Sequence, residues 1–292
     1  MNNTIHSRIA TALLIALMAP MSAAADSFRA SVAVDSGGRL EVDLSRGSVE
    51  VESHDSDEVE VDAEHEGIGG FEFVLSGDSG DAELVGRGSG WLRFGAHRVR
   101  VRIKLPEAFS LDIRTGGGHV ELEDLEGDVK VRTGGGSIEA SDVVGDLELR
   151  TSGGDVTVDG VDGMLQIATS GGRIDVSDVT GDVEARTSGG RVRVHDVGGR
   201  VEVSSSGGPI SVRFSGQPEG TISTSGGGIE VEFDEDANLD LRARTSGGRV
   251  SIDDDFYVRG SVRRSEVHGE VNDGGPSLDI QTSGGNVRIQ AR

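Results

Sequence analysis

The sequence predicts an all-β protein whose main body is a parallel single-stranded β-solenoid with ~18-residue two-strand coils, preceded by a β-rich N-terminal cap. Three observations support this fold class. Apolar and polar residues alternate twice within each repeated block, which is typical of half-buried strands. Glycines occupy the same places in every block, where the chain must turn. The blocks follow one another at a constant spacing of 18 residues, beginning at Thr115, Thr133, Thr151, Thr169 and Thr187.

Residues 1–25 are predicted to be a secretory signal peptide. A short polar start containing Arg8 precedes the apolar run "IATALLIALMAPM", and Ala23 and Ala25 supply the small residues of a cleavage site. The run is too short to span a bilayer, and no longer apolar stretch follows it, which disfavours a retained membrane anchor. We therefore expect an exported protein, in the periplasm, at the cell surface or outside the cell, with no transmembrane span after processing.

Residues 26–114 lack the repeat but contain strand-like segments. The segments "RLEVDL", "SVEVES" and "EVEVDA" alternate apolar and polar residues, and "GFEFVL" and "VRVRIKLP" follow them. The stretch "GRGSGWLRFGAH" is typical of a turn-rich loop. This part of the chain is predicted to form a β-rich N-terminal cap that runs directly into the coils.

Residues 115–292 are predicted to form the solenoid. Counted from the threonine of a block, positions 6, 8, 11, 15 and 17 are apolar, position 13 is glycine, and positions 3 and 4 are Gly-Gly. This pattern predicts two short strands joined by two corners whose backbone angles exclude side chains. The threonine continues the alternation of positions 15 and 17, so its side chain should point inward and close the strand with its methyl group.

A single block is too small to fold alone. Its five apolar side chains contribute roughly 1.5–3 kcal/mol each when buried, whereas ordering the backbone costs roughly 1–2 kcal/mol for each residue. Stacking each block on the next adds strand hydrogen bonds and a continuous core. The alternative, an antiparallel meander of hairpins, would not require a constant period.

The spacing loosens after the fifth block. It is 19 from Ser205 to Thr224, 21 from Thr224 to Thr245, and 37, or two turns plus one residue, from Thr245 to Thr282. Uncovered strand edges invite aggregation, so a hairpin-like insertion near residues 253–276 is expected to cover the open end.

Composition excludes several classes of partner and bond. The net charge of −23 disfavours nucleic acid, whose phosphates would be repelled. The chain contains no cysteine, which excludes disulfides and a lipid anchor on an N-terminal cysteine.

Columns of like charge are expected on the stacked coils. Neighbouring carboxylates about 4.8 Å apart would repel by roughly 0.9 kcal/mol in water, a cost that calcium could reduce. The GGxGxD corner of calcium-binding coils is absent, however, so we expect a solvated acidic face and no metal site. The columns consist of Asp124, Asp142, Asp178 and Asp196 at position 10, interrupted by Gly160, and of Asp128, Asp146 and Asp182 at position 14.

A column of arginines at position 18 has two interpretations. It could form an anion-binding groove, or it could balance the charge of the aspartate columns, and the second interpretation is favoured. The column contains Arg114, Arg132, Arg150 and Arg186.

No catalytic, cofactor-binding or metal-binding residue is predicted, and we do not expect an enzyme. Serines recur in every "TSGG" corner, whereas a nucleophile needs one activated position. The aromatic residues suited to sugar binding are Trp91, Phe94 and Tyr257, and Trp91 is expected to pack against the cap. The histidines lack metal-ligand spacing; His54, His65, His97, His119, His195 and His268 are scattered. His119 and His195 occupy outward positions of their coils and are expected to be ordinary surface residues.

The chain resembles the putative-adhesin family of β-strand-repeat proteins, a domain of unknown function. The resemblance rests on "SGGRLEVDLSRGSVEVESHDSDEVEVDAE", "VRIKLPEAFSLDIRTGGGHVELED" and "GGPSLDIQTSGGNVRI", and covers nearly all of residues 35–292. It implies an exported, non-catalytic surface or envelope protein and transfers no functional residues.

The leading hypothesis is therefore an exported β-solenoid that acts as an adhesin or as a cell-envelope interaction surface. Its ligand would be an envelope component, a polysaccharide or a protein, and its oligomeric state is left open. One alternative is a structural protein that assembles end to end. Another is a carbohydrate-active β-helix enzyme, which would need a pair of carboxylates beside Trp91.

Overall fold

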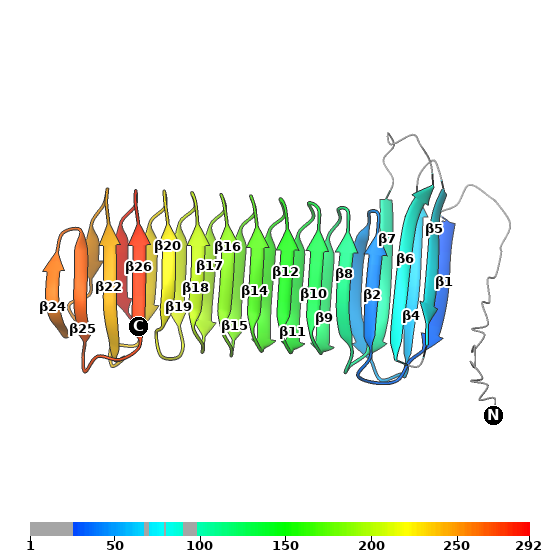
Figure 1. Cartoon of the computed structure of the whole chain (residues 1–292), viewed down its shortest axis with the longest axis horizontal. Helices are drawn as coiled ribbons and strands as arrows, with labels where there is room; N and C mark the ends of the chain where they lie inside the picture. Colours follow the sequence, from blue (N-terminus) through cyan, green and yellow to red (C-terminus); the bar gives the residue numbers. More distant parts are fainter. Residues whose placement is uncertain (1–25, 67–69, 79, 90–97) are drawn as a thin grey trace, which may run out of the picture.

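The described part of the chain is built from strands alone. The computed structural model describes residues 26–66, 70–78, 80–89 and 98–292. These residues form 27 strands and no helix. The strands stack side by side along one long axis (Figure 1), which confirms the predicted all-β class.

Two sheets contain all the strands. We call the 13-stranded sheet sheet A and the 14-stranded sheet sheet B. The central strands of sheet A are β9 (Val120–Glu126), β11 (Ile138–Val144), β13 (Val156–Asp162), β15 (Ile174–Val179), β17 (Val192–Val197), β19 (Ile210–Phe214) and β21 (Ile229–Phe233). Those of sheet B are β8 (Ser110–Thr115), β10 (Val129–Thr133), β12 (Leu147–Thr151), β14 (Leu165–Thr169), β16 (Val183–Thr187), β18 (Val201–Ser205) and β20 (Gly220–Thr224).

Strands from successive blocks pair in parallel. In sheet B, Val129 lies beside Leu147, and in sheet A, Val120 lies beside Ile138, each pair being 18 residues apart in sequence. Within a block the chain crosses from one sheet to the other and does not form a hairpin. This parallel pairing confirms a solenoid-like fold and excludes the antiparallel meander.

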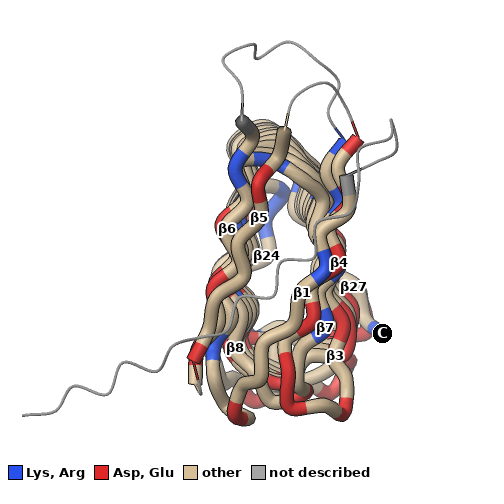
Figure 2. The backbone as a smooth tube through the Cα atoms, turned by 90° about the vertical axis from the view of Figure 1, so that its right-hand side faces the viewer, with Lys and Arg blue, Asp and Glu red and all other residues tan. Residues whose placement is uncertain are grey.

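One continuous apolar core lies between the two sheets. Figure 2 shows the sheets as opposite walls when the molecule is viewed along its axis. The residues at positions 6, 8, 11, 15 and 17 of the blocks are buried, and the largest buried side chains include Phe109, Phe214 and Phe233. Each strand therefore contributes alternate side chains to the core and presents the others to solvent.

The position 1 side chains form a buried column, as predicted, but their hydroxyl groups have a role that was not predicted. The Oγ1 atom of Thr169 donates to the carbonyl of Gly154 at 3.1 Å and accepts from the N–H of Gly172 at 3.3 Å. Each threonine therefore ties its corner to the corner one coil earlier. The column consists of Thr115, Thr133, Thr151, Thr169, Thr187, Ser205, Thr224, Thr245 and Thr282.

The second glycine of the Gly-Gly corner is explained by close packing and not by backbone angle. A Cβ atom on Gly172 would lie 1.8 Å from the carbonyl oxygen of Gly154, and the φ of Gly172 is not in the left-handed range. A Cβ on its neighbour Gly171 would meet nothing within 4 Å. The predicted reason is thus wrong for these two positions. At position 13 it holds for Gly127 and Gly145, whose φ values are 139° and 131°.

The N-terminal strands continue both sheets. Sheet A extends through β3 (Ser48–His54), β7 (Arg98–Pro106), β4 (Glu58–Glu66) and β1 (Asp26–Ala33). Sheet B extends through β2 (Arg39–Leu44), β6 (Asp81–Ser89) and β5 (Gly70–Gly77).

Residues 26–114, predicted to form a β-rich cap that runs directly into the coils, contribute strands to the same two sheets. Strands β2 and β3 pair in parallel with β8 and β9, and on their other sides with β6 and β7. Among the described strands of residues 26–114, β1, β4 and β5 are those whose pairs are all antiparallel. The repeat is hidden in the sequence because β4 and β5 interrupt it, so the first coil in sequence is the second in space.

The C-terminal end has the same arrangement. Its strands are β22 (Leu239–Thr245), β23 (Val250–Ile252), β24 (Val258–Arg263), β25 (Glu266–Val271), β26 (Ser277–Thr282) and β27 (Val287–Ala291). Strand β26 lies between β20 and β22, and β27 lies between β21 and β23.

The 37-residue interval is therefore not two further turns of the coil. Thr245 and Thr282 pair directly, because the last coil in sequence lies between the two coils that precede it in sequence. The interval does contain an antiparallel hairpin, β24–β25, which extends sheet B alongside β22. The last coil has partner coils on both sides.

Candidate functional site

The aspartates at position 10 are explained by the backbone. Asp124, Asp142, Asp178 and Asp196 all adopt the left-handed conformation, with φ values of 53°, 52°, 54° and 56°. Gly160 has a φ of 77° at the same position. Aspartate and glycine are among the few residues that tolerate this conformation, so the backbone explains why they occupy this position.

The aspartates at position 14 connect adjacent coils. The carboxylate of Asp146 accepts the backbone N–H of Met164 at 3.0 Å, and that of Asp182 accepts the N–H of Arg200 at 2.9 Å. Within the described residues, no group of three or more His, Asp or Glu side chains could hold a metal ion. The carboxylates of this column are occupied with backbone contacts.

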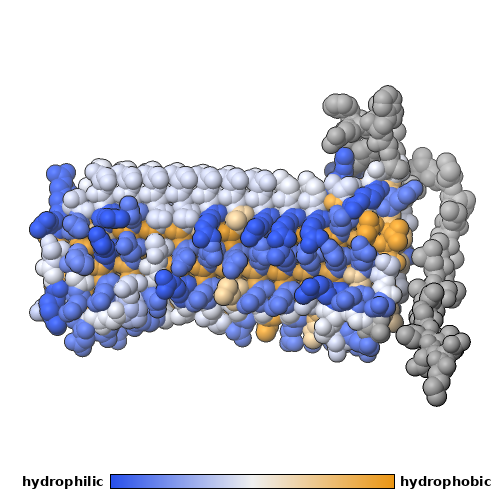
Figure 3. Space-filling view, in the orientation of Figure 1, coloured by the Kyte–Doolittle hydropathy of each residue, from blue (hydrophilic) through white to orange (hydrophobic). Residues whose placement is uncertain are grey.

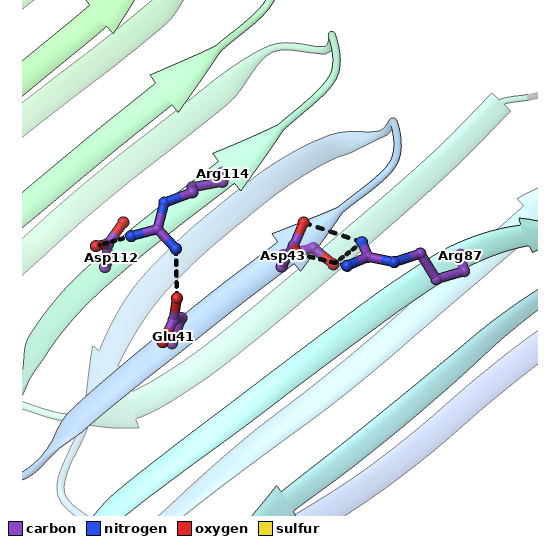
Figure 4. A network of polar contacts seen from close by, with 5 residues as sticks. All are labelled: Glu41, Asp43, Arg87, Asp112 and Arg114. Carbon is purple, nitrogen blue, oxygen red and sulfur yellow. Dashed lines mark hydrogen bonds and ion pairs between the residues drawn. The ribbon is translucent and has the colours of Figure 1, made fainter.

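The arginine column on sheet B is paired with carboxylates. Figure 4 shows Arg114 between Glu41 and Asp112, where its Nη2 donates to Asp112 Oδ2 at 2.7 Å. In the same network Arg87 Nη1 donates to Asp43 Oδ1 at 2.9 Å, joining β6 to β2. This hydrogen bond with Arg87 holds the pKa of Asp43 below its usual value, although burial opposes the shift.

Glu148 is the centre of a second network. Arg150 Nε lies 2.8 Å from its Oε1 and Arg132 Nη2 lies 3.2 Å from the same atom, while Lys130 contacts its Oε2. The hydrogen bond from Lys130 and the neighbouring guanidinium groups lower the pKa of Glu148. Arg186 pairs with Glu184. The predicted charge balance is therefore correct in kind, but these arginine partners lie at position 16 or on β2, not in the aspartate columns.

Sheet B is consequently a face of neutralised charge. Figure 3 shows rows of hydrophilic residues over its strands, below a pale edge where the Ser-Gly-Gly corners stack. Most of the guanidinium groups on its central strands contact carboxylates. These arginines would have to break their ion pairs before they could bind a separate anion.

A basic groove lies on the outer face of sheet A. Its volume is about 1140 Å³. Strands β17, β19, β21, β27 and β23 form it, in that spatial order. The cationic side chains of this basic groove are Arg191, Arg193, Arg213, Arg249, Arg264 and Arg288, together with His195 when protonated.

The sequence of each coil explains why the face is hollow there. Of the four residues at outward positions 5 and 7 in the two coils after β17, Pro209, Ser211 and Gly228 are small and the fourth is Glu230. The coil before them carries Arg191 and Arg193, and the coils beyond them carry Arg288 and Arg249. The three small residues leave space between the long side chains around them.

The basic groove concentrates positive charge on an acidic protein. Six arginines face two glutamates, Glu230 and Glu232, which leaves four net positive charges on the lining in a chain of net charge −23. Arg213 Nε lies 3.0 Å from Glu232, and Arg288 Nη1 lies 3.5 Å from Glu230.

Three of the six arginines lack such a partner. Among the described residues, no carboxylate oxygen lies within 4.0 Å of the guanidinium nitrogens of Arg191, Arg249 or Arg264. Two more pairs, Arg193 with Asp175 at 2.8 Å and Arg213 with Asp196 at 3.6 Å, reach carboxylates outside the lining. The ends of the groove thus carry unpaired cations.

His195 reports on this electropositive environment. Partial burial lowers its pKa, and the charges of Arg213 and Arg193 lower it further, against the opposing effects of Asp196 and Glu232. The prediction placed this histidine at an outward position, which is confirmed, but its place in the groove was not foreseen.

The other predicted candidates do not gather at one place. His119 Nδ1 lies 2.8 Å from Ser137 Oγ, and His54 Nε2 lies 2.8 Å from the carbonyl of Glu58. His65 is buried and stacks on Phe71. Tyr257 is 66% exposed. Trp91, Phe94, His97 and the predicted signal peptide of residues 1–25 lie outside the described residues.

The arginines of the basic groove were not among the residues predicted from the sequence, although a change of charge between blocks pointed to some of them. The outward positions 5 and 7 are His119 and Glu121 in the first block but Arg191 and Arg193 in the fifth. That change of charge could have indicated a basic face. The contribution of Arg249, Arg264 and Arg288 could not be found in this way, because it depends on the inserted last coil.

The described chain has no helix with the length and apolar character needed to cross a membrane.

No curated protein matches the sequence. The structure is similar to that of a putative adhesin from Bacteroides fragilis, with 10% identity, coverage of 91% of this chain and 97% of that chain, and a TM-score of 0.41. It is also similar to a putative lipid binding protein from Parabacteroides distasonis, with 11% identity, the same two coverages, and a TM-score of 0.42.

The sequence matches the family Toastrack DUF4097 over residues 37–290. The match spans most of the 292 residues and confirms the resemblance to a domain of unknown function built of β-strand repeats. The chain belongs to the Toastrack DUF4097 family.

Proposed function

We propose that this protein is an exported, non-catalytic interaction protein of the cell envelope, acting in the manner of an adhesin. The proposal rests mainly on the basic groove of sheet A. In this proposal the working unit is the 18-residue two-strand coil, whose outward positions present side chains about every 4.8 Å along a rigid sheet. The sheet fixes the backbone positions of these arginines before binding, which favours recognition of a repetitive surface.

A binding experiment tests the proposal. The chain from Asp26 onward should bind saturably to envelope fragments of the source organism. Replacing Arg191, Arg193 and Arg288 by glutamate should abolish this binding. The matched control is Arg242→Glu on β22 of sheet B, an exposed arginine for which the described residues offer no carboxylate within 4.0 Å. Equal binding by the triple variant and the control would reject the proposal.

Export is tested separately. Fractionation of cells that produce the full chain should find the protein outside the cytoplasm, shortened at its N-terminus. Deletion of residues 2–25 should retain it inside. A full-length product in the cytoplasm would contradict this part of the proposal.

A further inference from the structure

We infer that the basic groove binds a segment of an acidic polysaccharide that lies along the solenoid axis and bridges the arginines at the two ends of the groove. This inference rests on the proposed function and names the class of ligand. Three observations support the inference: the positions of the unpaired arginines, the distance that separates them, and the groups on the floor between them.

The arginines form two clusters. Arg191 and Arg193 belong to the coil of β17, at one end of the basic groove, while Arg249 on the coil of β23 and Arg264 in the turn of the β24–β25 hairpin stand at the other. The outer two strands, β17 and β23, are separated by four interstrand intervals, or about 19 Å. A single small anion cannot reach both clusters, so the geometry favours an elongated ligand with more than one negative group.

Guanidinium groups suit carboxylates and sulfates. An arginine donates two parallel hydrogen bonds to such a group, and charge-assisted bonds of this kind are stronger than neutral ones. Because Arg191, Arg249 and Arg264 have no carboxylate partner among the described residues, they can meet a ligand without first breaking an ion pair.

The floor between the clusters offers neutral polar groups beside two glutamates that are already paired. Ser211 presents a hydroxyl and Asn286 an amide, while Glu232 pairs with Arg213 and Glu230 with Arg288. The Oδ1 atom of Asn286 accepts the backbone N–H of Arg249 at 2.9 Å, which orients the amide and leaves its Nδ2 group to donate. Hydroxyl and amide groups between charged ends match a sugar chain, whose own hydroxyls need partners between its acidic groups.

The same lining argues against nucleic acid. Among its residues there is no Phe, Tyr or Trp on which a base could stack. The remainder of the molecule, at a net charge of −23 overall, would repel a long phosphate backbone that extended beyond the groove. An acidic sugar segment confined to the groove meets less of this repulsion.

The test measures binding of three probes by calorimetry: a galacturonic acid oligomer long enough to span the groove, dextran sulfate, and neutral dextran. The galacturonic acid oligomer or dextran sulfate should bind, more weakly as salt rises, and dextran should not. Binding of only one acidic probe would identify carboxylate or sulfate as the recognised group. Failure of both, or equal binding of dextran, would overturn the inference.

Two double variants locate the site. Arg191→Gln with Arg193→Gln removes one cluster, and Arg249→Gln with Arg264→Gln removes the other. Each should weaken binding of the acidic probe by at least about tenfold, since charge-assisted hydrogen bonds are lost, whereas Arg242→Gln on sheet B should leave it unchanged. Thermal melting confirms that the variants fold. Unchanged affinity in either double variant would overturn the bridging arrangement.

His195 provides a second readout by NMR. A bound anion should offset the charges of Arg193 and Arg213, so the pKa of His195 should rise when the acidic probe saturates the protein. An unchanged pKa at saturation places the probe elsewhere and overturns the inference. A single-stranded oligonucleotide that binds more tightly than either acidic probe would also overturn it. If envelope fragments bind while both acidic probes fail, only the ligand class is rejected.

Discussion

At the scale of single residues, the position 1 threonines show how a repeated hydroxyl stabilises a stacked fold. Each is inward-facing and nearly inaccessible. The hydroxyl group of Thr169 bonds to glycine backbone atoms of its own corner and of the neighbouring coil's corner. The same two bonds are made by Thr151, Thr187, Thr224, Thr245 and Thr282. An unpaired buried carbonyl or N–H group costs about 1–3 kcal/mol. The side chain must therefore combine a small apolar part with a hydroxyl, which accounts for threonine and for Ser205 at the equivalent position.

Replacing Thr169 by valine should lower the free energy of unfolding by about 1–3 kcal/mol, because the shape is kept while two buried backbone groups lose their partner. Thr169→Ser is the matched control, since Ser205 Oγ already accepts the N–H of Gly208 at 2.9 Å. Urea denaturation measures both. A valine variant as stable as the serine variant would show that the hydroxyl contributes nothing.

At the scale of the coil, the Gly-Gly corner shows that adjacent glycines can be present for different reasons. Gly172 lies against the carbonyl of Gly154 in the coil before, so no side chain fits there. Gly171 is exposed, with open space where its Cβ would lie, and nothing in the structure explains its glycine. Position 4 of each corner is thus a point where successive coils lie too close together to admit a side chain.

The two glycines therefore predict opposite outcomes for one substitution. Gly172→Ala should destabilise the protein by at least about 2 kcal/mol, because the coils must separate to admit the methyl group, while Gly171→Ala should change stability by less than about 0.5 kcal/mol. Thermal unfolding of the two variants gives the comparison. Similar melting temperatures for both would mean that the corners do not pack as closely as described.

At the scale of the whole molecule, the two ends share one device: the coil that is outermost in sequence is not outermost in space. Strand β2 lies between β6 and β8, and β26 lies between β20 and β22. Each of these terminal coils makes strand hydrogen bonds on both sides. In a stack stabilised by nearest-neighbour contacts, this arrangement ties down the segments that would otherwise fray.

Deletion of residues 277–292 should therefore affect more than the deleted coil. Strands β22 and β23 lose their parallel partners β26 and β27, so hydrogen exchange should accelerate across residues 239–271. Residues 120–203, in coils far from the deletion, should keep their protection and serve as an internal control. Unchanged exchange in 239–271 would show that the C-terminal hairpin region holds together without the inserted coil.

The repeating unit could be predicted from the sequence: the constant spacing, the alternation of inward and outward residues and the corner glycines. These features are local and recur, so periodicity alone reveals them. The order of the coils at both ends could not be predicted in this way and depends on tertiary packing, because every coil presents a similar apolar pattern and similar strand edges to its neighbours. The basic groove depends on that choice, since the insertion of β27 between β21 and β23 is what brings Asn286 and Arg288 between Gly228 and Arg249.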